Sequence, residues 1–91
     1  MGLCEVRIRL WAIDSLKAKR GIAKSLLARM HNRFNVAVAE VRYLDSKEHL
    51  GLAVVSVANS RKVVDGLLSS VVTFLEDDLR FEVEDLALTY V

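Results

Sequence analysis

The stretch SLKAKRGIAKSLLARMHNRFN, residues 15–35, decides how the rest of the chain is read, because its apolar residues recur at three- and four-residue spacing. This spacing predicts an amphipathic helix with one buried face. Ser15, with Asp14 before it, can accept a hydrogen bond from a free backbone N–H and so begin the helix, and Asn35 can end it. The predicted buried residues are Leu16, Ala23, Leu26, Leu27, Met30 and Phe34.

Apolar and polar residues alternate on both sides of this helix, which is typical of half-buried strands. Before the helix, the apolar side consists of Cys4, Val6, Ile8, Leu10 and Ala12. After it, in residues 36–44, the more apolar side consists of Ala37, Ala39, Val41 and Tyr43. The turn sequence DSKE then joins this strand to residues 49–58 in a hairpin. Because residues 49–58 are apolar on both faces, we expect them in the middle of a sheet.

The second half of the chain repeats the pattern of a helix followed by a strand. Asn59 or Ser60 is expected to cap the helix. Its predicted buried residues are Val63, Val64, Leu67, Leu68, Val71, Phe74 and Leu75. In residues 80–91 the apolar phase shifts between Val83 and Leu86. This shift predicts a bulge near Glu84 and Asp85 in an edge strand.

The predicted order of elements is strand, helix, strand, strand, helix, strand. This order favours an α+β fold of the ferredoxin-like βαββαβ type, with a four-stranded antiparallel sheet and two helices on one face. The chain of 91 residues has no proline and no linker-like segment. We therefore expect residues 1–91 to form a single domain.

Several classes of protein do not fit this composition. Cys4 is the only cysteine, so there is no internal disulfide or cysteine metal cluster, and we expect it to be a small buried side chain. No apolar run approaches the ~20 residues of a membrane span, and the segment MGLCEVRIRLW carries charges where a signal peptide is apolar. We expect a cytoplasmic protein with no membrane contact.

The motifs of catalytic and metal sites are also missing. The segment GIAKS resembles the end of a phosphate-binding loop, but Ala23 stands where a glycine must precede the lysine. Neither His31 nor His49 has a partner at metal-ligand spacing. The consecutive acidic residues 76–78 point in different directions around a helix rather than toward one point. We therefore expect no enzyme activity, no metal and no cofactor.

The uncovered face of the predicted sheet suggests contact between copies of the chain. Its third strand offers no aromatic ring for stacking RNA bases, in contrast to RNA-binding domains of this fold. Trp11 lies near arginines and small apolar residues, which fits a binding surface and, better, an oligomer contact. We expect a homodimer or a larger homo-oligomer that forms through this face or an edge strand. The predicted interface residues are Trp11, Val36, Val38, Ala53, Val55 and Val57.

The charges of the two helices separate into two groups if the helices run antiparallel. Lys17, Lys19 and Arg20 would then face the acidic residues 76–78, so this secondary basic cluster would be compensated within the domain.

The opposite end would be positive, with few acidic partners. Its predicted anion-binding or nucleic-acid-binding residues are Lys24, Arg29, Arg33, Arg61 and Lys62. Free N–H groups at the start of the second helix would add donors for a phosphate. The alternative is a basic surface that is simply solvated.

The segment SLKAKRGIAKSLLARMHNRFNVAVAEV, residues 15–41, resembles the YlxP-like family of small bacterial proteins, a domain of unknown function. The likeness lies in an SLKxKR start and an NRFNVxVAEV junction, and it continues through LGLAVVSVANS. It departs at WAIDSLK and YLDSKEHLG, where relatives have a proline and a Trp-Gln hairpin. The resemblance implies a ferredoxin-like fold and no established enzyme activity. It adds Asn32 to Lys17, Lys19, Arg20 and Arg33 as candidate contact residues.

In many bacteria, genes of this family lie near those for translation initiation and ribosome maturation, which implies RNA or a ribonucleoprotein as a partner. Our first hypothesis is therefore a non-enzymatic RNA- or ribosome-associated protein that contacts phosphates through basic residues of its helices. The second is a self-associating or regulatory module that pairs through its sheet and binds a small anion as a secondary ligand. A continuous positive strip would favour the first, and a large apolar patch the second.

Overall fold

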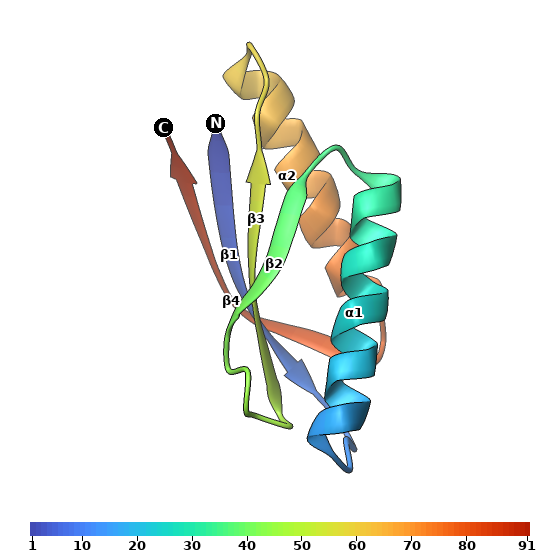
Figure 1. The fold of residues 1–91 in the computed structure, drawn as a ribbon. Coiled ribbons are helices and arrows are strands. Elements are labelled where there is room, and N and C mark those ends of the chain that lie inside the picture. The colour runs from blue at the N-terminus through green and yellow to red at the C-terminus, as the bar shows by residue number, and fades with distance from the viewer.

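Two helices cover one face of a four-stranded antiparallel sheet in the computed structural model, which describes residues 1–91 (Figure 1). The elements in chain order are β1 (Gly2–Leu10), α1 (Leu16–Arg33), β2 (Ala37–Arg42), β3 (His49–Ser56), α2 (Arg61–Glu76) and β4 (Phe81–Tyr90). The strands lie in the order β2-β3-β1-β4, so β3 and β1 are central, and β2 and β4 are the edges. The predicted ferredoxin-like βαββαβ fold is confirmed.

The core lies between the sheet and the helices and consists of buried apolar residues from both layers. β1 and β3 place every second side chain in it, because successive side chains of a strand point to opposite faces. The helices contribute Ala23, Leu26, Met30, Val64, Leu68, Val71 and Leu75. Cys4 is fully buried, as expected, and its burial raises the pKa of the thiol to about 11.

The ends of the first strand and of both helices differ partly from the prediction. β1 ends at Leu10, and Ala12 has a left-handed backbone with φ 56° that breaks the expected alternation. Ser15 caps α1 as predicted, because its hydroxyl accepts a hydrogen bond from the N–H of Ala18 at 3.1 Å. The helix ends at Arg33, before Asn35. On α2, Val63 is exposed and not part of the buried stripe.

The facing of β2 was predicted wrongly. Val38 pairs with Val54, a buried residue of β3 whose side chain points toward the helices, so Val38 also lies on the helix side. Val36 likewise packs against the core. These two valines therefore do not belong to the uncovered face, where an interface was expected. The reason is Glu40, which also points to the helix side and so breaks the apolar pattern of the inner face.

The other predicted interface residues are spread over the sheet. Ala53 and Val55 lie on the uncovered face and are half-buried. Val57 follows the last residue of β3 and is 67 % exposed. Trp11 is 50 % exposed, and the guanidinium of Arg9 lies 4.7 Å from the centre of its ring.

β4 contains the predicted bulge. Arg7 pairs with Asp85 and Ile8 pairs with Val83, so Glu84 is an extra residue in the ladder. The bulge restores the inward facing of the apolar residues on both of its sides, which explains the phase shift in the sequence. No helix is long and apolar enough to cross a membrane.

Candidate functional site

The exposed side of α1 carries three cations that face solvent. Lys17, Arg20 and Lys24 are three and four residues apart, a spacing that places them on one side of a helix. We call these three residues the basic face. All three are exposed, and none takes part in an ion pair of the structure. α1 has no Asp or Glu of its own, so no acidic neighbour on the helix offsets these three charges.

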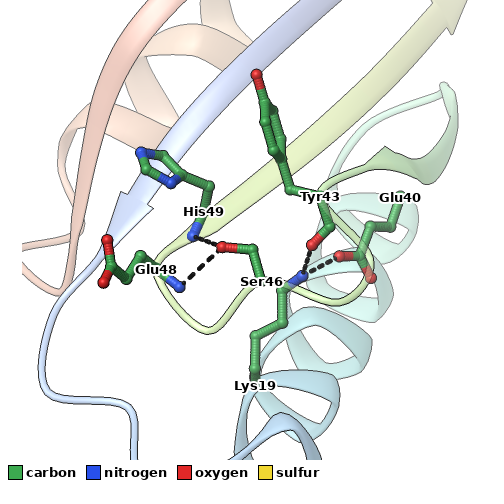
Figure 2. A network of polar contacts seen from close by, with 6 residues as sticks. All are labelled: Lys19, Glu40, Tyr43, Ser46, Glu48 and His49. Carbon is green, nitrogen blue, oxygen red and sulfur yellow. Dashed lines mark hydrogen bonds and ion pairs between the residues drawn. The ribbon is translucent and has the colours of Figure 1, made fainter.

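Lys19, by contrast, points into the protein and is fully buried. Its Nζ donates to Oε2 of Glu40 at 2.6 Å and to the backbone carbonyl of Tyr43 at 2.6 Å (Figure 2). It was predicted to be part of a surface cluster, and that prediction is wrong for this residue. No signal in the sequence places Lys19 in the core, because Glu40, the partner that a buried charge needs, comes close to it only in the folded protein.

The network around Lys19 continues into the β2–β3 connection. The carbonyl of Tyr43 also accepts a hydrogen bond from the N–H of Ser46 at 3.0 Å. The hydroxyl of Ser46 in turn accepts from the backbone N–H groups of Glu48 and His49, both at 3.2 Å (Figure 2). Tyr43 has a left-handed backbone with φ 60°, an arrangement that non-glycine residues rarely adopt. The buried lysine therefore ties the first turn of α1 to this connection.

The predicted facing of residues 17–20 against the acidic end of α2 does not occur. α1 extends beyond the C-terminal end of α2 (Figure 1), so the acidic residues lie beside the second half of α1. Asp78 pairs with Arg29 at 3.7 Å and with Arg80 at 2.9 Å. The hydrogen bond from Arg80, with the nearby charge of Arg29, lowers the pKa of the Asp78 carboxyl from its ordinary value.

The four cations expected at the opposite end are distributed over separate surfaces. Arg29 and Arg33 line a groove between the helices, a hollow of about 770 Å³, where both guanidinium groups lie near the ring of Phe74. Arg61 lies 4.1 Å above the ring of Tyr90, and Lys62 lines another hollow with Asn35. Asn32 is exposed near the end of α1. The expectation that Arg29 has no acidic partner is wrong.

The uncovered sheet face carries a mixed group of charges. The carboxylate of Glu84, on the bulge, lies 2.9 Å from Nε2 of His49 and 3.4 Å from Nε of Arg7. Arg42 lies 3.6 Å from Glu5. Positive and negative groups alternate here, so this face presents no continuous field to an anion. No group of three or more His, Cys, Asp or Glu side chains is arranged to hold a metal ion.

The fold and these surfaces define a small α+β domain of the ferredoxin-like type with a basic helix on its outer side. A family model described as "Protein of unknown function (DUF503)" matches residues 1–88, and the chain belongs to this family. It is similar to the "Uncharacterized protein YlxP" of Bacillus subtilis (strain 168), with 30 % identity over 76 residues, which is 84 % of this chain and 83 % of that protein. The expected family resemblance is confirmed.

Proposed function

We propose that this protein is a non-enzymatic RNA- or ribosome-associated protein that contacts phosphates through the basic face of α1. The observation that carries the proposal is the set of exposed, unpaired cations Lys17, Arg20 and Lys24 on a helix without acidic residues. Clustered cations on one face are the electrostatic feature by which proteins bind nucleic-acid backbones.

The geometry of α1 supports contact with successive phosphates. Lys17 and Lys24 are seven residues apart, so they span about 10 Å along the helix axis. This length corresponds to about three nucleotides of a helical strand. Three cations at this spacing favour backbone contacts, which carry no sequence information.

Lys19 supports the same interface by fixing the orientation of α1 on the sheet. Lys19 holds the first turn of α1 against β2 through Glu40 and Tyr43. Because Lys17 and Arg20 flank Lys19 in the sequence, this anchor keeps their side chains on the solvent side. A rigid element positions contact residues better than a mobile loop does.

The test is binding of a short unstructured RNA, measured by fluorescence anisotropy at several salt concentrations. Three phosphate contacts predict a logarithmic salt slope of about −2 for a single strand. The double variant Arg20→Ala, Lys24→Ala should flatten the slope by about one unit or more. The double variant Arg33→Ala, Arg61→Ala is the matched control, since it removes the same charge at the end of α1 and the start of α2. Equal loss in both variants, or no binding by the unmodified protein, would refute the proposal.

A further inference from the structure

The outer edge of β4 presents backbone groups away from the sheet in a defined pattern. Val91 N–H donates to the carbonyl of Met1 at 2.9 Å, so these two residues form a hydrogen-bonded pair of the β1–β4 ladder. Such pairs alternate along an antiparallel ladder, so Ala87 and Thr89 also bond to β1. Their neighbours Leu86, Leu88 and Tyr90 therefore turn their backbone N–H and C=O groups away from the sheet, where the N–H of Leu86 donates to Oδ1 of the exposed Asp85 at 2.9 Å.

The side chains of this edge are apolar and exposed. Leu86 and Leu88 pair with the buried residues Val6 and Cys4, so they lie on the helix side of the sheet. They are nevertheless 39 % and 48 % exposed. Residues 86–91 include no charged side chain. The first half of β4 carries the bulge and three acidic side chains, whereas this uncharged and uncovered second half is a ready template for pairing with another strand.

The other edge of the sheet is protected against such pairing. β2 has six residues, and a register shift at Val41 leaves only residues 37–40 in an unbroken ladder. It ends at the charged Arg42 and is followed by the left-handed Tyr43. Bulges, short length and charge are the features that prevent edge-to-edge pairing. The free edge available for a partner strand is therefore that of β4.

We propose that β4 pairs antiparallel with β4 of a second copy of this chain, around a two-fold axis that passes through Ala87. In this register the outward-facing Leu86 of each copy meets Leu88 of the other copy. The sheets of the two copies then form one continuous sheet, and the four leucines pack against one another. A two-fold contact requires such a self-complementary surface.

The charges of α2 fit the same axis. On the flank of α2 beside β4, Arg61 lies over the ring of Tyr90, and Asp65 accepts a hydrogen bond from the hydroxyl of that tyrosine. The same side of the helix, followed at three- and four-residue spacing, ends at Glu76. Neither Arg61 nor Glu76 takes part in an ion pair within the chain. The two-fold axis reverses the second copy, so the Arg61 end of one α2 faces the Glu76 end of the other. This charge complementarity favours a second copy as the occupant of the edge.

The register is tested by cross-linking. In the proposed ladder the two copies of Ala87 form a narrow pair, with about 4.5 Å between Cα atoms, which a disulfide can span. Under mild oxidation, Ala87→Cys should form a covalent dimer, whereas Ala39→Cys on β2 should not. The native Cys4 is buried and is present in both variants, so it does not account for a difference between them. Equal cross-linking of the two variants would overturn the proposal.

The interface is tested by sedimentation velocity over a range of micromolar concentrations. The unmodified protein should dimerise, and Leu88→Asp should raise the dimer Kd by at least tenfold. Val57→Asp is the matched control, since Val57 is also an exposed apolar residue but follows β3, which does not pair with β4. Arg61→Glu and Glu76→Arg should each weaken the dimer, and the double variant should recover it. A monomer at all concentrations, or a dimer that Leu88→Asp leaves unchanged, would refute the pairing.

Discussion

Nζ of Lys19 lies 2.6 Å from Oε2 of Glu40, and this buried ion pair joins the first helix to an edge strand of the sheet. The lysine side chain is completely buried and the glutamate side chain is 15 % exposed. Burial of two charges costs free energy, which their attraction and further hydrogen bonds offset only when the geometry is good. Here the carbonyl of Tyr43 supplies the further bond. The pair therefore fixes one arrangement of α1 on β2.

Lys19→Met should lower the free energy of unfolding by about 3–5 kcal/mol, because it leaves the carboxylate of Glu40 without its partner. The double variant Lys19→Met, Glu40→Leu should recover most of this loss, since both charges are then removed together. Urea unfolding followed by circular dichroism measures both. A single variant as stable as the unmodified protein would show that the pair contributes nothing.

Gly51→Ala should destabilise the fold by about 1–3 kcal/mol through overpacking. A Cβ at this position would lie 2.7 Å from Cβ of Arg42 and 3.2 Å from its backbone, and β2 cannot move away without breaking the ladder. Gly21→Ala on α1 is the matched control, because a Cβ there meets nothing within 4 Å. It should stabilise the helix by about 0.5–1 kcal/mol. Thermal unfolding of the two variants should therefore shift in opposite directions.

Asp78 should make the stability depend on pH in the acidic range. Its pKa is lowered in the folded protein, chiefly by the hydrogen bond from Arg80, so the folded state favours the ionised carboxylate. The stabilisation is present at pH values above the ordinary pKa of 3.8 and is lost as the pH falls through the lower folded-state value. Asp78→Asn should lower the stability at neutral pH by less than about 1 kcal/mol. The difference from the unmodified protein should disappear in acid, and a difference that grows in acid would contradict this assignment.

The sequence predicts the fold wherever one periodicity is unbroken. Alternation in β1 and the three- and four-residue spacing in α1 both identify the correct buried faces. These patterns mislead where a charged residue is buried with a partner. Because charged residues are expected at the surface, the face of β2 that carries Glu40 was predicted to be the outer one. Lys19 was assigned to the surface for the same reason. Neither residue shows from its own position that the other is close, because that contact depends on the tertiary fold.

The placement of the charges on the helices was less predictable than the helices themselves. The antiparallel arrangement of two helices does not determine how far one extends beyond the other. In the structure α1 extends past the end of α2 (Figure 1), so Asp78 reaches Arg29 and leaves Lys17 and Arg20 without an acidic partner. This offset depends on the loop lengths and on core packing. It moves the most available cations from the predicted end of the domain to the basic face.

Arg33 and Arg61, at the end of α1 and the start of α2, differ from the cations of the basic face in their contacts within the domain. Arg33 lies over the rings of Phe34 and Phe74, and Arg61 lies over Tyr90, so both guanidinium groups already have favourable contacts within the domain. Release of these contacts would oppose the binding of a phosphate there. The double variant Arg33→Ala, Arg61→Ala should therefore change the salt slope of RNA binding by less than about half a unit.

The variant of the basic face, Arg20→Ala, Lys24→Ala, removes the same amount of charge, so the net charge of the protein is equal in the two cases. Any general electrostatic attraction falls equally in both, and only direct phosphate contacts distinguish them. The salt slope should flatten by about one unit or more in the variant of the basic face alone. If the slope instead flattens with Arg33→Ala, Arg61→Ala, the interface lies at the end of the domain where α1 finishes and α2 begins.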